Sequence, residues 1–112
     1  MMPAIRLTST EKIMYKILHE LGERLSLTCY AQYPIGKHRA DFAIPELGLA
    51  IECETAVWNR NRLKDRKEQA RDTEMKQKGW KVMRFSEIEL KEKEEKVKEK
   101  IREKIKKLVV GK

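Results

Sequence analysis

Apolar side chains recur every three or four positions near the start of the chain, a spacing typical of one face of an α-helix. The pattern predicts a helix over residues 10–25. Thr8 and Glu11 have the spacing of a capping box and mark where this helix begins. Ser86 and Glu89 have the same spacing and precede a second apolar stripe, which predicts a final helix reaching about residue 110. The two stripes consist of Ile13, Met14, Ile17, Leu18 and Leu21, and of Val97, Ile101, Ile105 and Leu108.

Between these helices, apolar and polar residues alternate, as they do along strands with one buried face. Two turns rich in Pro and Gly separate the first three of these segments. A very polar stretch that ends at Gly79 predicts a helix before the fourth segment. The predicted order is αβββαβα, with no repeat and no linker, so we expect one α/β domain over residues 1–112. The predicted strands are residues 25–33, 38–44, 49–54 and 80–85, the turns are residues 34–37 and 45–48, and the polar helix is residues 63–78.

The register of the middle hairpin is strongly specified by its apolar positions. A four-residue turn after Ile44 places Leu49 opposite it, and the apolar positions of both strands then share one face. The polar positions share the other face, where Asp41 lies opposite Glu52. The other pairs expected in this and the preceding hairpin are Phe42–Ile51, Ala40–Cys53, Arg39–Glu54, Tyr33–His38, Ala31–Ala40 and Cys29–Phe42.

Three carboxylates, those of Asp41, Glu52 and Glu54, therefore converge on the polar face of this hairpin. Like charges directly opposite each other destabilise a strand pair, so a compensating group is expected. Mg²⁺ commonly binds one or two carboxylates together with phosphate oxygens. The alternative is a solvated polar face on which Arg39 neutralises Glu54. The pattern favours a site for Mg²⁺ or Mn²⁺ formed by Asp41 and Glu52.

Basic residues are concentrated in the second half of the chain. The whole chain has 26 Lys and Arg against 18 Asp and Glu, and residues 60–112 hold 20 of these basic residues and 11 of the acidic ones. Such a surface suits nucleic-acid phosphates, although a Lys- and Glu-rich surface also serves solubility or heat adaptation. No apolar run is long enough to span a membrane, and the start has no secretory pattern. We therefore expect a cytoplasmic protein with Cys29 and Cys53 reduced.

Several runs resemble one family of nucleases. The segment IGKHRADFAIP at residues 35–45, followed by LAIECE at residues 49–54, resembles the core of the PD-(D/E)XK nuclease superfamily. Arg71-Asp72 in the polar helix and GWKVMRF at residues 79–85 are similar to later motifs of short restriction-endonuclease-like proteins related to very-short-patch-repair endonucleases. The resemblance covers roughly residues 9–90.

The resemblance implies a mixed four-stranded sheet flanked by helices, with its fourth strand parallel to the third. It implies an endonuclease that hydrolyses DNA with Mg²⁺ or Mn²⁺, in which Asp41 and Glu52 hold the metal. Glu54 stands where the superfamily usually has lysine and would act as a base or a further ligand. Glu11 matches a helix-borne catalytic glutamate, although capping alone also explains it. The residues expected to grip DNA are Lys37, Arg39, Arg60, Arg62 and Arg71.

Other functions remain open from the sequence. One is a catalytically inactive nucleic-acid-binding protein with the same fold. Another is a Holliday-junction resolvase, a class that is usually dimeric, so a homodimer is also open. The resolvase motif normally keeps the lysine, and Glu54 counts against it. A third is an interaction module whose basic helices bind a protein partner.

Overall fold

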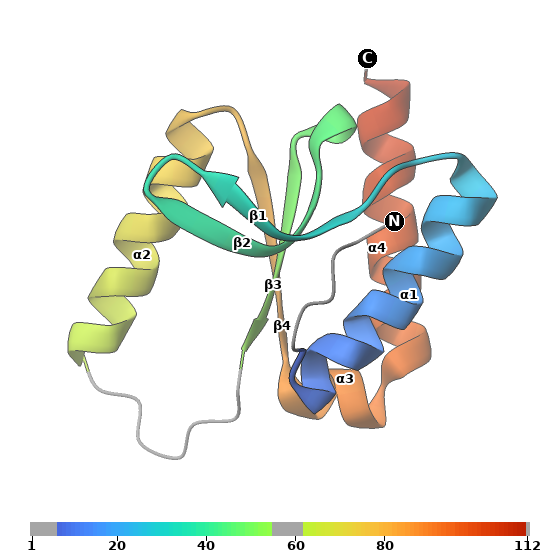
Figure 1. The fold of residues 1–112 in the computed structure, drawn as a ribbon, viewed down its shortest axis with the longest axis horizontal. Coiled ribbons are helices and arrows are strands. Elements are labelled where there is room, and N and C mark those ends of the chain that lie inside the picture. Colours follow the sequence, from blue (N-terminus) through green and yellow to red (C-terminus); the bar gives the residue numbers. More distant parts are fainter. Residues whose placement is uncertain (1–6, 55–61, 112) are drawn as a thin grey trace.

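The computed structural model describes residues 7–54 and 62–111, with side chains from residue 66 onward in the second range. A four-stranded sheet in the order β1-β2-β3-β4 lies between α2 on one face and α1, α3 and α4 on the other (Figure 1). β1, β2 and β3 are antiparallel neighbours, and β4 is parallel to β3. The elements are α1 (Ser9–Leu25), β1 (Tyr30–Ile35), β2 (His38–Ile44), a 3₁₀ turn (Pro45–Leu47), β3 (Leu49–Glu54), α2 (Arg62–Gln77), β4 (Lys81–Ser86), α3 (Glu87–Glu92) and α4 (Glu94–Val110). The predicted element order and mixed sheet are confirmed.

Both predicted capping boxes are present, and the last helix differs from the prediction. The Thr8 hydroxyl accepts a hydrogen bond from the Glu11 backbone N–H at 3.1 Å, and Ser86 caps α3 in the same way. The predicted single final helix is two helices, because Lys93 leaves helical geometry at φ −133° and ψ 43°. The break lets Leu90 of α3 and Val97 of α4 both enter the core.

The first strand begins and ends later than predicted: it runs over Tyr30–Ile35 and not over residues 25–33, because α1 continues to Leu25. The register of this hairpin is two residues away from the expected one. Tyr33 pairs with Ala40, not with His38, because β1 continues to Ile35 and the chain turns at Gly36. Gly36 has φ +59°, a conformation that glycine adopts without strain. β1 lies at the edge of the sheet and therefore tolerates a proline within it. The pairs expected here, Ala31–Ala40 and Cys29–Phe42, are wrong for the same reason, and Ala31 pairs with Phe42.

The register of the second hairpin is as predicted at Phe42–Ile51 and Ile44–Leu49, where the pairing described for β2 and β3 ends. Ala40 does not share a face with Phe42: it packs with Ala50 and Met75 against α2. The predicted Ala40–Cys53 and Arg39–Glu54 pairs are therefore wrong. The cause lies at Asp41, whose carboxylate occupies the Cys53 N–H that a regular ladder uses for backbone pairing. Opposite it, Gln32 at φ +52° interrupts β1.

The larger core lies between the sheet and α1, α3 and α4. Its buried residues are all apolar and come from every one of these helices and from β2, β3 and β4. The core on the α2 face is small and consists of Ile35, Ala40, Ala50 and Met75. No helix in the described ranges is long and apolar enough to cross a membrane.

Candidate active site

Asp41 and Glu52 are brought together by two hydrogen bonds that cross between β2 and β3. The Asp41 backbone N–H donates to Glu52 Oε2 at 3.2 Å, and the Cys53 backbone N–H donates to Asp41 Oδ2 at 2.8 Å. Each carboxylate is thus fixed by the other strand's backbone. The predicted neighbourhood of the two acids is present, although their backbones do not continue the regular ladder.

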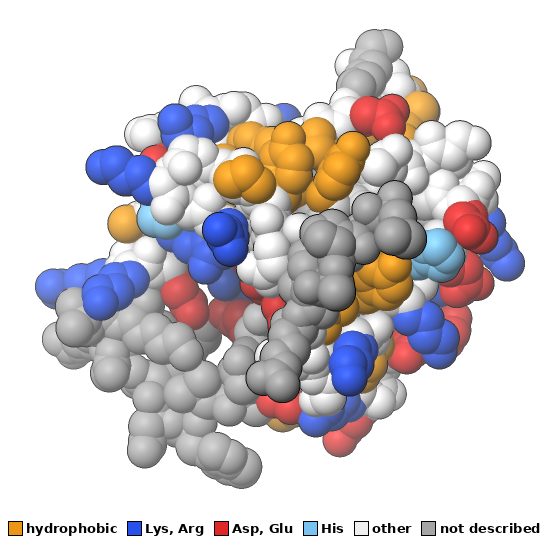
Figure 2. Space-filling view, in the orientation of Figure 1, with side chains coloured by type: hydrophobic (Ala, Val, Ile, Leu, Met, Phe, Trp, Pro, Cys, Tyr) orange, Lys and Arg blue, Asp and Glu red, His pale blue; other side chains and the backbone are white. Residues whose placement is uncertain are grey.

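Glu52 lies at the floor of this site, with 2% of its surface exposed. Burial, then the nearby Asp41 carboxylate and a hydrogen bond between the two groups, together raise the pKa of its carboxyl to about 8, although Arg71 opposes the rise. Figure 2 shows acidic side chains deep in a hollow of the molecule, below a group of Lys and Arg side chains. Two carboxylates this close repel each other, and a bound cation would relieve that repulsion.

Arg71 of α2 supplies one positive charge to the site. Its terminal nitrogen Nη2 donates to Glu52 Oε1 at 2.7 Å and also to the backbone carbonyl of Arg39. Its Nε is buried and has no hydrogen-bond partner among the described residues. We expected Arg71 to contact DNA; in the structure its guanidinium hydrogen-bonds to Glu52, and the side chain remains 29% exposed.

Glu54 forms an ion pair with an arginine of the neighbouring strand. Arg84 of β4 has its Nε 3.7 Å from Glu54 Oε1, and its Nη2 donates to Asp72 Oδ1 at 2.6 Å. Arg84 therefore connects β3 to α2. Arg39, the residue expected to neutralise Glu54, is an exposed residue of β2. Sequence reasoning missed Arg84. The signal was the adjacent pair Arg71-Asp72, because two neighbouring helical residues of opposite charge can meet two partners on adjoining strands.

Glu11 connects the start of α1 to the site. Its Oε1 accepts from the Thr8 backbone N–H at 2.9 Å, and its Oε2 accepts from Gln32 Nε2 at 3.4 Å. Its charge also helps to raise the pKa of the Cys53 thiol, after burial and the nearer Asp41. Glu11 therefore caps a helix and adds to the negative field around Asp41.

The residues expected to contact DNA lie in different places. Lys37 is exposed in the turn of the first hairpin, and Arg39 is exposed near the start of β2. Arg60 lies outside the described residues, as does the side chain of Arg62 at the start of α2. His38 is half-buried and lies 2.8 Å from Glu74 of α2, which ties this hairpin to the helix that carries Arg71.

The donor set can be tested against a divalent metal. In the described part of the chain, no three His, Cys, Asp or Glu side chains form a ready-made ligand cluster. Mg²⁺ does not need one, since it often keeps several waters and binds one or two carboxylates plus substrate phosphates. The hard oxygens of Asp41 and Glu52 fit such a two-carboxylate site, with Arg71 as the group that competes for Glu52 Oε1.

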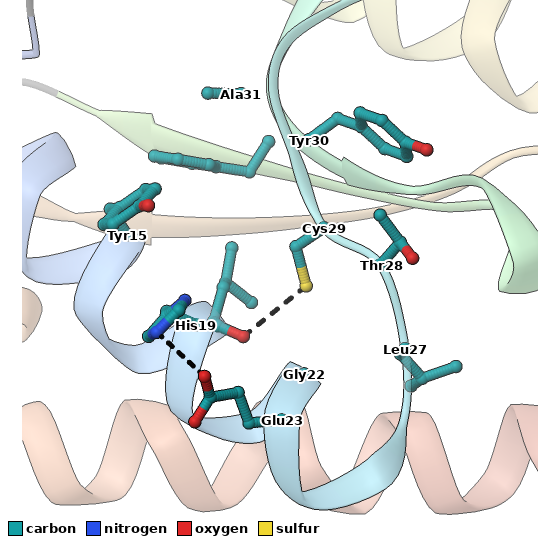
Figure 3. Close-up of a pocket in the computed structure, with 11 residues that line it drawn as sticks. Tyr15, His19, Gly22, Glu23, Leu27, Thr28, Cys29, Tyr30 and Ala31 are labelled. Carbon is teal, nitrogen blue, oxygen red and sulfur yellow. Dashed lines mark hydrogen bonds and ion pairs between the residues drawn. The ribbon is translucent and has the colours of Figure 1, made fainter. Parts of the chain in front are cut away.

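A separate cavity of about 650 Å³ lies between α1 and β1 (Figure 3). Cys29 Sγ donates to the Leu18 carbonyl oxygen at 3.5 Å across it, and burial raises the pKa of this thiol to about 11. On its outer wall His19 lies 3.3 Å from Glu23 and stacks on Tyr15. This lining shares no residue with the acidic site.

The sequence and the fold were each compared with those of known proteins. A comparison with curated proteins finds no match. Among solved structures, the chain is similar to one described as the homing endonuclease I-Bth0305I catalytic domain, with a TM-score of 0.68, 23% identity, and coverage of 86% of this chain and 92% of the other. This likeness shows that the chain has the fold of that catalytic domain. The model of the restriction endonuclease-like family REase_MTES_1575 matches residues 11–105, which include all the elements around the site. The chain belongs to this restriction endonuclease-like family.

Proposed function

We propose that the protein is a Mg²⁺- or Mn²⁺-dependent endonuclease that hydrolyses phosphodiester bonds of DNA. The observation that carries the proposal is the pairing of Asp41 with the buried Glu52 across two strands. Family membership and fold support a nuclease. The finer kinship to very-short-patch-repair endonucleases, which rests on the order of the motifs, is part of the proposal.

In this proposal Asp41 and Glu52 hold the metal, and the Cys53 backbone N–H keeps Asp41 in place. A bound divalent ion supplies an activated water and neutralises charge on the phosphate. Arg71 donates a hydrogen bond to Glu52 and would orient its carboxyl toward the ion, and its guanidinium is a group of the kind that binds phosphate oxygens. Glu11 adds negative charge near Asp41, which favours a cation over an anion at this point.

A catalytically inactive nucleic-acid-binding protein is the second candidate, and one observation favours it. Arg71 already donates a hydrogen bond to Glu52 Oε1 at 2.7 Å, so it occupies an oxygen that a metal would need. If the guanidinium holds Glu52 permanently, the acids serve only to orient a phosphate-binding arginine. Metal binding distinguishes the two candidates.

The decisive experiment compares wild type with Asp41→Asn in thermal unfolding and in cleavage of duplex, single-stranded and branched DNA. With a chelator present and at pH 9, above the pKa of Glu52, the variant should melt at the same temperature as wild type or slightly higher, since removing one of two close like charges relieves about 0.2–1 kcal/mol. With excess Mg²⁺ or Mn²⁺, wild type should gain stability and the variant far less, because the ion binds only the folded site. Cleavage should be lost in the variant.

Glu95→Gln is the matched control, since Glu95 is an exposed acid of α4. It should follow wild type under both conditions. Parallel melting curves for wild type and Asp41→Asn with chelator and with metal would overturn the metal site. Parallel curves together with binding but no cleavage of DNA would leave the binding-only candidate.

A further inference from the structure

A groove lined by lysines follows the outer edge of β4, on the part of the sheet most distant from β1. It consists of two adjoining hollows of about 480 and 360 Å³, and Lys104 lines both. Met83 and Trp80 form part of its apolar floor. We call this surface the lysine groove; its lysines are Lys76, Lys81, Lys96, Lys100, Lys104 and Lys107.

Four of the six lysines form one row on α4. Lys96, Lys100 and Lys104 follow each other at four-residue steps and Lys107 comes three residues later, so they share one side of the helix. The buried stripe of α4, Val97, Ile101 and Ile105, fixes the rotation of this helix and thus the place of the row. The row is about 17 Å long at 1.5 Å per residue, which matches about five phosphates of one DNA strand.

The charge of the groove is largely uncompensated among the described residues. Only two acidic residues, Glu99 and Glu103, line it, and Arg102 already binds Glu99 through two hydrogen bonds of 2.7 and 3.1 Å. Lys100 lies 3.8 Å from Glu89, which is a long, weak ion pair. The lysine groove is therefore a concave surface with a net positive charge, in which most lysines have no acidic partner among the described residues.

The partner that fits is a polyanion and not a second copy of the chain. β4 ends the sheet, so in the described ranges no strand covers its outer edge. An uncovered edge invites pairing with another strand, but charged lysines beside it oppose approach of an identical, equally basic edge. The same charges attract a row of phosphates, whose counterions are released on binding.

We propose that the lysine groove binds the phosphate backbone of a nucleic acid, outside the point of cleavage. The groove shares no residue with the acidic site, and β3 separates β4 from Asp41 on β2. The inference rests on the proposed function for its choice of nucleic acid, and it adds a second contact surface. A nucleic acid held at both surfaces is fixed in orientation relative to Asp41 and Glu52.

The test measures the salt dependence of binding to a duplex oligonucleotide, with a chelator present so that cleavage does not contribute. The groove variant carries Lys96→Gln, Lys100→Gln, Lys104→Gln and Lys107→Gln. The control variant carries Lys16→Gln, Lys91→Gln, Lys93→Gln and Lys106→Gln, four exposed lysines outside the groove, and has the same net charge. Each phosphate that a variant no longer neutralises should reduce the slope of log K against log salt by about 0.9, so the slope of the groove variant should fall by roughly 3 to 4 units.

Equal slopes for the groove and control variants would overturn the inference and point to another partner for the lysines. The single variants Lys100→Gln and Lys104→Gln, each expected to reduce the slope by about one unit, keep the test valid if the fourfold variant folds poorly. Failure of this inference differs from failure of the proposed function. If the groove binds DNA in a salt-dependent way but no substrate is cleaved, only the proposed nuclease activity is rejected. If DNA is cleaved but the slope of the groove variant is unchanged, only the role of the lysine groove is rejected.

Discussion

The two faces of the sheet bury different chemical groups. The face covered by α1, α3 and α4 buries a large apolar cluster, whereas the face covered by α2 buries a much smaller apolar cluster and the ionisable Glu52. The sheet is thus asymmetric, with most of its apolar packing on the face of three helices and the buried Glu52 on the face of α2. Figure 1 shows these helices on the two faces.

This difference has an energetic meaning. Burying one Ile, Leu or Phe side chain stabilises a fold by about 1.5–3 kcal/mol, and burying a carboxyl beside another carboxylate costs free energy. The apolar face provides the surplus that allows Glu52 to stay buried next to Asp41. Changes on the first face should therefore act on stability, and changes on the second should act on charge and chemistry.

The largest effect on stability is expected from Ile101→Ala on the apolar face. Ile101 of α4 is fully buried, and truncating such a side chain costs about 2–5 kcal/mol through the forfeited transfer free energy and the cavity left behind. Denaturation in urea measures it, with the exposed Val110→Ala as control. A destabilisation no larger than that of the control would show that α4 does not carry the core.

The next effect is a pH dependence that comes from the charged face. Without metal, the folded protein holds the Glu52 proton up to about pH 8, whereas an unfolded chain releases it near 4.5. The folded state therefore binds more protons between these values, and stability should fall as pH rises through that window. One proton gives a slope of at most about 1.4 kcal/mol per pH unit.

Glu52→Gln should remove this contribution, so its stability relative to wild type should rise from pH 5 to pH 9. Urea denaturation in chelator at several pH values provides the measurement. Glu95→Gln, exposed on α4, should keep the wild-type slope. A Glu52→Gln curve parallel to wild type would mean that Arg71 holds Glu52 ionised throughout.

The smallest effect concerns Glu11, which lies where the two faces meet. Gln can replace Glu in a capping box, so Glu11→Gln should change stability by only a few tenths of a kcal/mol, and Glu11→Ala by about 1 kcal/mol. Thermal unfolding measures both. If the charge of Glu11 also serves the reaction, Glu11→Gln should lower cleavage although the helix stays capped. Equal cleavage by wild type and Glu11→Gln would leave Glu11 a capping residue only.

The sequence predicted those parts of the molecule that depend on local patterns. The stripe on α1, the capping box at Thr8 and the register at Phe42–Ile51 follow from spacing alone, and all three are present. The first hairpin was misplaced because an edge strand can run through Pro34, which is a turn residue elsewhere.

The arrangement of charges was harder to predict because it depends on tertiary contacts. Asp41 lies near Glu52 as expected, but it does so by taking a backbone N–H of β3, which no alternation of residue types shows. Arg71 and Arg84 reach their acids across the packing of α2 on the sheet. Long arginine side chains can satisfy several partners, and which one they choose is decided only when the helix is docked.

The two cysteines lead to a statement about oxidation. Air and peroxide attack the thiolate and not the thiol. Burial, with help from Glu46, raises the pKa of Cys29 to about 11, and burial with the neighbouring acids raises the pKa of Cys53 well above its ordinary value. At pH 7 about one molecule in ten thousand exposes a Cys29 thiolate, and fewer a Cys53 thiolate. The folded protein should therefore keep both sulfurs reduced in aerated buffer, and sulfenic acid or disulfide should form only when the chain opens.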